Sequence, residues 1–192
     1  GLLLYDERAS GESGGRHRTY GWADVDDLPV ALDYLAGRDD VDAGRIGILG
    51  FSIGGQIALR AAARDPRLQA VVAEEPGFAT LDDLPPPDSL GDAWIVFNYR
   101  IAFQGLKWYT GREPGIGVVE ALGHIAPRPV LFVAAGPPDE PGDWLVRHFY
   151  RQAAEPRAWW LVPEAAHGQV PALRPGEYES MIVSFFDAAL RP

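Results

Sequence analysis

The chain has 192 residues, of which 47% are hydrophobic and 23% charged, so it is long and apolar enough to bury a globular core. Its formal net charge is -10 and its basic residues are scattered singly, which argues against a nucleic-acid partner. It contains no cysteine, so disulfides, thiolate catalysis and cysteine-based zinc sites are excluded. No apolar run reaches the roughly 18 residues that span a bilayer, and we expect no membrane partner.

Short apolar runs that alternate with helical patterns begin near the N-terminus. Residues 2–5 predict the first strand, and a loop rich in glycine and serine follows over residues 10–15. Apolar residues on one helical face then predict a helix over residues 25–35, with Asp24 as its N-cap. Pro29 lies inside this segment and predicts an irregular first turn.

The same alternation continues to the C-terminus. It predicts strands over residues 45–50, 68–73, 129–134 and 158–162, with helices over residues 52–63, 143–153 and 178–190. Alternating strands and helices are typical of a parallel sheet that is covered on both faces. The predicted fold class is therefore α/β, with a mostly parallel sheet flanked by helices.

A long insertion over residues 76–125 interrupts this alternation. It contains three consecutive prolines and then an aromatic stretch that includes Trp94, Phe97, Phe103 and Trp108. Long insertions in compact domains are commonly lids or interaction surfaces. We expect the insertion to form a cap on a core made of residues 1–75 and 126–192. Its aromatic side chains would either line an apolar substrate pocket or form the buried face of a cap helix.

The sequence GFSIG, from Gly50 to Gly54, lies between a predicted strand and a predicted helix. A sharp strand-to-helix turn would lift the oxygen of Ser52 out of the carboxyl edge of the sheet, with small residues required at Gly50 and Gly54. The backbone N–H of Ile53, at the start of the helix, would point to where an oxyanion forms. We predict Ser52 as a nucleophile and Ile53 as an oxyanion donor. The alternative is a turn that only packs the helix close to the sheet.

A nucleophilic serine needs a general base, and the chain contains four histidines. His167 follows the last predicted strand, on a loop at the same sheet edge as Ser52, and it is the predicted base. His148 lies within a predicted helix, His124 at the amino end of a strand and His17 in the early loop. We expect these three to have packing or solvated roles.

The third member of such a site is a carboxylate that orients the imidazole and stabilises its cation. Asp139 follows the strand over residues 129–134, again at the carboxyl edge, and is the predicted residue. Glu140 is the nearest rival. Glu74 and Glu75, which follow the strand over residues 68–73, are a more distant alternative.

These motifs resemble those of α/β-hydrolase-fold serine hydrolases of the esterase and acyl-peptidase kind. Residues 5–13 (YDERASGES) look like the family's D-x-R-G-x-G-x-S segment, with Ala9 in place of a glycine. The resemblance implies that Asp6 and Arg8 brace the active-site loops. Residues 41–47 (VDAGRIG) and 125–131 (IAPRPVL) are also similar to the family, whose triads follow the chain order of Ser52, Asp139 and His167.

The resemblance also implies a segment that the chain does not contain. In the family, a further strand lies between the one over residues 2–5 and the one before the serine, and the loop after it supplies a second oxyanion donor through an HGG-like motif. We find no such motif in the sequence. We therefore expect the 192 residues to be the C-terminal part of a longer protein, with the missing N-terminal segment or a second copy covering the gap.

The predicted reaction is hydrolysis of a carboxylic ester through an acyl-enzyme, for which no metal or organic cofactor is needed. The expected partner is a small-molecule ester or amide. Two alternatives remain open. One is a peptidase or amidase that uses the same triad, and the other is a hydrolase-like module that binds without catalysis.

Overall fold

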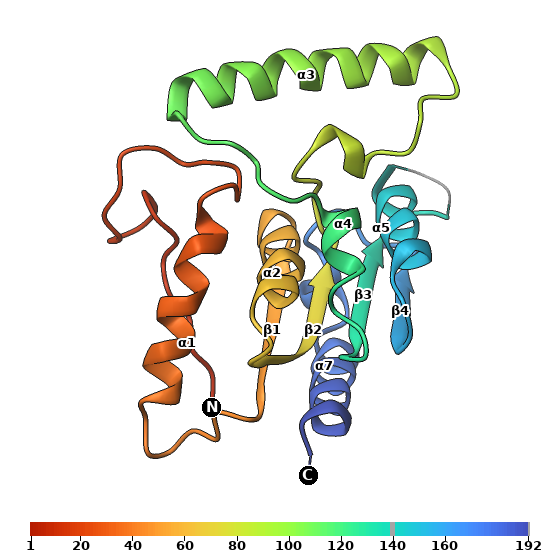
Figure 1. Cartoon of the computed structure of the whole chain (residues 1–192). Helices are drawn as coiled ribbons and strands as arrows, with labels where there is room; N and C mark the ends of the chain where they lie inside the picture. Colours follow the sequence, from red (N-terminus) through yellow and green to blue (C-terminus); the bar gives the residue numbers. More distant parts are fainter. Residues whose placement is uncertain (139–140, 192) are drawn as a thin grey trace.

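The computed structural model describes residues 1–138 and 141–191, except for the side chains of residues 141–143. Four parallel strands form one sheet in the order β1 (Ile46–Phe51), β2 (Leu68–Glu74), β3 (Val130–Ala135) and β4 (Arg157–Val162). Every residue of β3 is buried because helices cover both faces of the sheet (Figure 1). Since all four strands run the same way, their carboxyl ends meet at one edge.

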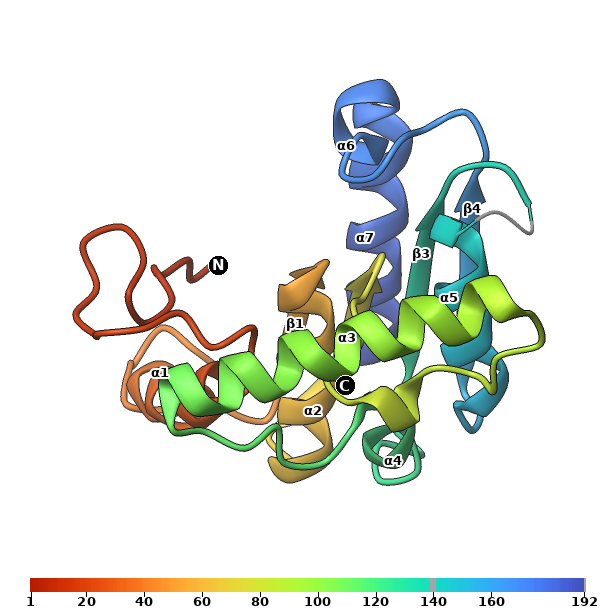
Figure 2. The ribbon, with the colours of Figure 1, turned by 90° about the horizontal axis from the view of Figure 1, so that it is seen from above.

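Two layers of helices enclose the sheet (Figures 1 and 2). On one side lie α1 (Leu28–Ala36), α2 (Ile53–Arg64), α4 (Val118–Leu122) and α5 (Pro141–Gln152). On the other side lie α6 (Val170–Leu173) and α7 (Pro175–Leu190). The long helix α3 (Leu90–Thr110) crosses above the carboxyl edge of the sheet. Within the described part of the chain, no helix is long and apolar enough to cross a bilayer.

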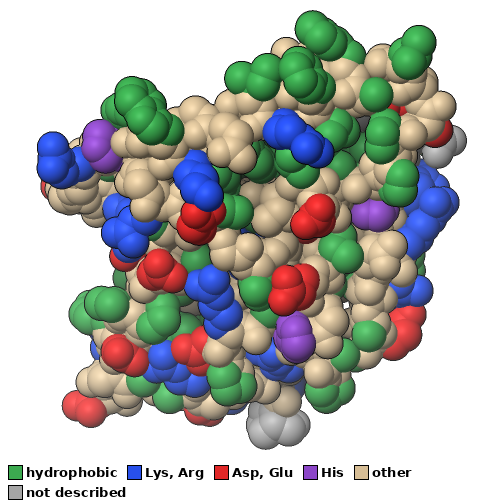
Figure 3. Space-filling model, turned by 45° about the horizontal axis from the view of Figure 1, so that its top comes forward, with side chains coloured by type: hydrophobic (Ala, Val, Ile, Leu, Met, Phe, Trp, Pro, Cys, Tyr) green, Lys and Arg blue, Asp and Glu red, His purple; other side chains and the backbone are tan. Residues whose placement is uncertain are grey.

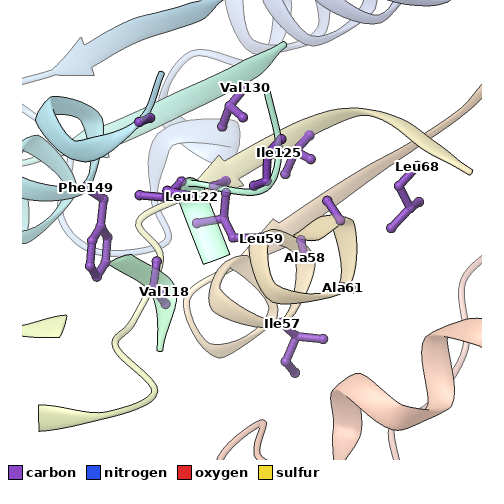
Figure 4. Packing of buried hydrophobic residues seen from close by; sticks show 14 of the residues in the cluster. Ile57, Ala58, Leu59, Ala61, Leu68, Val118, Leu122, Ile125, Val130 and Phe149 are labelled. Carbon is purple, nitrogen blue, oxygen red and sulfur yellow. The ribbon is translucent and has the colours of Figure 1, made fainter. Parts of the chain in front are cut away.

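The main core lies between the sheet and the layer of α2, α4 and α5. Small side chains on α2, such as Ala58 and Ala61, let this helix approach the sheet closely, and Leu122 and Ile125 fill the space beside it (Figure 4). A second cluster of buried residues lies between the sheet and α7. The predicted α/β class is confirmed, and the strands and helices predicted after residue 45 are present close to their expected bounds.

The predicted strand over residues 2–5 is wrong. These residues are irregular, and Leu2 and Leu4 are exposed, because no strand of the described chain pairs with them. The loop that follows residues 2–5 is held by side-chain contacts. Arg8 forms an ion pair with Asp27, and the carboxylate of Asp6 accepts a hydrogen bond from the N–H of Glu12 at 2.9 Å.

Asp24 does not cap the first α-helix. It is the first residue of a short 3₁₀ helix, η1 (Asp24–Asp27), and its carboxylate accepts a hydrogen bond from the hydroxyl of Thr19 at 2.5 Å. α1 begins only at Leu28, with Pro29 in its first turn. The predicted irregularity at this end of the helix is therefore confirmed.

A fully buried arginine on α2 ties two distant segments to the core. The guanidinium of Arg60 donates to the carbonyl oxygens of Gly21 and Ile116, both at 2.9 Å, and also to that of Pro114. Burial lowers the pKa of this side chain to about 10. The loop before η1 and the segment after α3 are thus held by one side chain that the sequence pattern did not single out.

Replacement of Arg60 by methionine is expected to lower the free energy of unfolding by about 3 kcal/mol, because buried carbonyl groups lose their donors. Chemical denaturation measures this loss. Arg64→Met on the same helix is the matched control, since Arg64 is exposed and its ion pair with Asp26 is worth less than about 1 kcal/mol. Equal effects of the two substitutions would contradict the role given to Arg60.

Candidate active site

Ser52 lies at a tight turn between β1 and α2. Its backbone has φ 53° and ψ −115°, a strained conformation for a residue with a side chain. A Cβ atom on Gly50 would lie 2.1 Å from the carbonyl oxygen of Gly54, and one on Gly55 would lie 2.9 Å from Cα of Pro76. The turn thus requires glycine at positions 50 and 55. The expectation for Gly54 is wrong, because a Cβ atom there would meet open space.

Hydrogen bonds from the neighbouring strand hold this turn in place. The N–H of Ser52 donates to the carbonyl of Glu74, the last residue of β2, at 2.9 Å. The carbonyl of Ser52 accepts from the N–H of Gly77 at 3.0 Å. The serine is therefore fixed against the loop that follows β2.

The imidazole of His167 lies beside this serine. His167 is on the loop between β4 and α6, and its Nε2 is 3.1 Å from Oγ of Ser52. The imidazole packs on the ring of Phe51, with 4.8 Å between the ring centroids. Gly168 has φ 75°, and a Cβ atom at this position would lie 2.9 Å from Phe51. A glycine next to the histidine therefore allows the loop to pack against β1.

Glu75 completes the constellation from the loop after β2. Its Oε1 is 2.9 Å from Nδ1 of His167, and its Oε2 accepts the N–H of Gly168 at 2.7 Å. The side chain is buried, and the backbone is left-handed with φ 44°. The N–H of Glu75 donates to the carbonyl of Val133 at 2.8 Å, which anchors the residue to β3. A buried carboxylate in this position fixes both the orientation and the tautomer of the imidazole.

The structure thus brings together Ser52 and His167, the two residues predicted as nucleophile and base. Asp139 and Glu140, the predicted carboxylates, lie outside the described residues. Among the described residues, the carboxylate that contacts the imidazole is that of Glu75, which the sequence suggested only as a distant alternative. The feature of the sequence that pointed to Glu75 was its position directly after β2, because β2 is the strand that pairs with β1.

The other histidines lie in different surroundings. His17 contacts the ring of Tyr109, with centroids 4.4 Å apart, and His124 follows α4. His148 lies on α5, where burial lowers the pKa of its imidazole.

Ile53 is the first residue of α2, so its backbone N–H is one of the donors that a helix leaves free at its N-terminus. This N–H directly follows the serine. The position fits the predicted oxyanion donor, which stays a prediction.

A second acidic residue is buried beneath Glu75. Glu74 accepts a hydrogen bond on Oε2 from the hydroxyl of Tyr178 on α7 at 2.6 Å, while its Oε1 is buried without a hydrogen-bond partner. Burial raises the pKa of Glu74, and the nearby Glu75 raises it further. Burial and the contact with Glu74 raise the pKa of the Tyr178 hydroxyl as well. The pair joins α7 to the end of β2, directly below the site.

Five aromatic side chains pack together as a wall between α3, the segment before η1 and the loop after β2. Phe78 directly follows Gly77, whose N–H donates to the carbonyl of Ser52. The centroid of the Phe78 ring lies 4.8 Å from the ring of Tyr99 and 5.7 Å from the ring of Phe103, and both of these residues are on α3. Tyr20 lies 6.4 Å from Phe78, and its carbonyl accepts a hydrogen bond from Gln56 near the start of α2. Trp22 packs edge-on against Phe103. Segments far apart in the sequence therefore meet beneath α3.

Comparison with known proteins relates the chain to hydrolases. Residues 2–86 match the family model of the X-Pro dipeptidyl-peptidases (S15 family). The chain is 25% identical over 219 residues to the uncharacterized protein PA2218 of Pseudomonas aeruginosa, a match that covers 86% of this chain and 58% of that protein. A shorter stretch of 53 residues is 47% identical to the bis(hydroxyethyl) terephthalate hydrolase of Streptomyces coelicolor and covers 26% of this chain and 17% of that enzyme. The chain thus spans little more than half the length of PA2218.

Solved structures define the fold. The Pyrococcus furiosus esterase Pf2001 superimposes with a TM-score of 0.71 at 21% identity, over 97% of this chain and 70% of that one. The chain therefore has the α/β-hydrolase fold.

Replacement of Glu74 by glutamine tests the buried carboxylate. The pKa of Glu74 is raised on folding, so Glu74 favours the fold at low pH and costs stability as the pH rises through its folded-state pKa. Glutamine is neutral and still accepts from Tyr178. We therefore expect Glu74→Gln to be more stable than the wild type near pH 8, on the order of 1 kcal/mol or about 2–4 °C in Tm, with the gain vanishing near pH 4. Glu179→Gln, at an exposed position on α7, is the control. A gain that does not depend on pH would contradict this assignment.

Proposed function

We propose that the chain is a serine hydrolase that cleaves carboxylic esters through an acyl-enzyme intermediate. The proposal assigns Ser52 as nucleophile, His167 as general base and Glu75 as the carboxylate that orients the base. The carrying observation is the continuous chain of contacts from Oγ of Ser52 to Nε2 of His167 at 3.1 Å, and from Nδ1 of His167 to Glu75 at 2.9 Å. This arrangement is the one that nucleophilic catalysis by serine requires.

Acylation is the first half of the reaction. With Nδ1–H donated to Glu75, Nε2 carries a free lone pair and accepts the proton of the Ser52 hydroxyl as Oγ attacks the ester carbonyl. The tetrahedral oxyanion is stabilised by the N–H of Ile53 and by the positive end of α2. The imidazolium then gives its proton to the leaving alcohol, and the C–O bond of the ester breaks.

Deacylation repeats these steps with water. His167 takes a proton from the water molecule that attacks the acyl carbonyl, and it returns that proton to Oγ of Ser52 as the acid leaves. The carboxylate of Glu75 stabilises the imidazolium in both halves. The steps as written use no metal or organic cofactor.

From the aromatic wall we infer that the part of the substrate bound beside Ser52 is an aromatic or other flat apolar acyl group. The wall includes the rings of Tyr20, Phe78 and Tyr99, and Phe51 lies on the side of the imidazole. Flat rings favour offset or edge-on contacts with such a group. The partial identity with a hydrolase of bis(hydroxyethyl) terephthalate, an aromatic ester, supports the same substrate class. In this proposal α3, which belongs to the expected cap, covers the acyl site. The helix α4, from the same segment, packs into the main core instead.

Peptide hydrolysis is the second candidate, because residues 2–86 match the X-Pro dipeptidyl-peptidase model. The same three residues could cleave an amide, for which the imidazolium protonates a leaving amine. Turnover of a benzoyl ester compared with the matching benzoyl amide and with an X-Pro aminoacyl amide separates the two candidates. Faster turnover of the X-Pro amide than of the ester would favour the peptidase.

The assignment of the carboxylate predicts unequal effects of two substitutions. Glu75→Gln is expected to lower kcat for an ester on the order of 10³- to 10⁴-fold, because the imidazole loses the charge that fixes its tautomer. Asp139→Asn is the matched control and is expected to change kcat less than about threefold. Ser52→Ala should abolish both turnover and labelling by a fluorophosphonate. A large loss in Asp139→Asn with little loss in Glu75→Gln would overturn the assignment of Glu75.

The aromatic wall predicts a selective effect at Tyr99. Tyr99→Ala should lower kcat/KM for a benzoate ester about tenfold, because a ring contact is lost, and should change kcat/KM for an acetate ester of the same alcohol less than about threefold. Steady-state kinetics on the two esters measure the difference. Equal losses on both substrates would show that Tyr99 does not contact the acyl group.

A further inference from the structure

The helix α3 has two apolar faces, and only one of them contacts the rest of the chain that the structure describes. Its inner face contains Val96, Phe103 and Leu106, which are half-buried, and Phe103 packs on the main core. Its opposite face carries five large apolar side chains that are between 50% and 92% exposed: Leu90, Trp94, Phe97, Ile101 and Trp108. We call these five residues the outer stripe. Hydrophobic side chains gather along the upper part of the molecule, where α3 lies (Figure 3).

The outer stripe has the spacing of a helix-packing seam. Its successive members are separated by four, three, four and seven residues. At 3.6 residues per turn, all five side chains fall within a sector of about 60° around the helix. Such spacing is typical of helices that pack lengthwise against another helix.

The outer stripe is large for a surface without a partner. From the size of these side chains and their exposure, it presents on the order of 600 Å² of apolar surface. Contiguous apolar patches on monomeric proteins are typically about 300–600 Å² at their largest, and a stable interface buries about 800 Å² per partner. The outer stripe and its rim are therefore of the size that one specific partner would cover.

We propose that the outer stripe is a dimerisation surface, on which α3 of a second copy of this chain packs in antiparallel orientation. The two tryptophans of the stripe are symmetric about Ile101, since Trp94 lies seven residues before it and Trp108 seven residues after it, and Phe97 would lie opposite Gly105 of the other copy. A twofold axis at Ile101 places Trp94 of each copy opposite Trp108 of the other. The surface is thus complementary to itself, as a twofold interface requires.

The charges on α3 fit this arrangement. The helix contains three charged residues, Asp92, Arg100 and Lys107, all outside the outer stripe, and Lys107 forms an ion pair with Glu113 of its own chain. Because none of them lies in the outer stripe, the antiparallel register brings no charged side chain into the apolar seam, and the two copies of Arg100 lie on its flank near the twofold axis. A lipid surface is a poorer match, because lipid-bound helices are rich in cations on their polar face and this chain has a net charge of -10.

The first experiment is sedimentation equilibrium of the full chain across a range of concentrations. The wild type is expected to reach twice the chain mass of 20.9 kDa. Ile101→Glu, which places two carboxylates at the axis, should raise the dissociation constant about 30-fold or more. Val30→Glu, at an exposed valine on α1, introduces the same charge elsewhere and should leave the dissociation constant unchanged.

The second experiment tests the register of the two helices by disulfide cross-linking of introduced cysteines. The chain has no cysteine of its own that could compete. Under mild oxidation, Ile101→Cys should form a covalent dimer with itself. Trp94→Cys and Trp108→Cys should cross-link when mixed, and much less when each is oxidised alone. A wild type that stays monomeric at all concentrations would overturn the proposal. Flotation of a monomeric wild type with anionic vesicles would overturn it too, in favour of a lipid surface. Neither experiment depends on hydrolase activity, so failure of the proposed function leaves this proposal standing.

Discussion

The hydrogen bond from the N–H of Ser52 to the carbonyl of Glu74 joins the turn at Ser52 to the end of the neighbouring strand. Because Glu75 is the next residue, the same bond sets the separation between the serine and the carboxylate. The left-handed backbones at Ser52 and Glu75 turn their side chains out of the sheet edge, and His167 bridges them from the loop after β4. Strain at these two residues is sustained by the strands on either side, since β2 pairs with both β1 and β3.

The helix α2 links this site to the rest of the molecule. Its N-terminus presents Ile53 beside the serine, its alanines pack on the sheet, and Arg60 holds the loop that carries Tyr20. The same guanidinium also holds the segment that follows α3. The wall of aromatic rings and the helix above it are thus positioned by contacts to one buried helix. In the proposed dimer, the outer face of α3 would be held from the other side as well.

The sequence predicted the parts of the site that depend on local structure. A strand, a glycine-rich turn and a helix placed Ser52, and the loop after the last strand placed His167. It offered Glu75, the carboxylate that contacts the imidazole, only as a distant alternative to Asp139, which lies outside the described residues. Several loops at the same sheet edge carry acidic residues, and the choice between them depends on backbone geometry at Glu75 that no pattern in one sequence specifies. The strand expected at residues 2–5 failed for a related reason, since an apolar run becomes a strand only when another strand pairs with it.

The most direct test of the central claim is the proton between His167 and its carboxylate. A proton held on Nδ1 by a buried carboxylate is shielded from exchange and gives a far-downfield resonance in the ¹H NMR spectrum. If Glu75 is the partner of His167, this resonance is present in the wild type and in Asp139→Asn, and it is lost in Glu75→Gln. A resonance that survives in Glu75→Gln and disappears in Asp139→Asn would contradict the account.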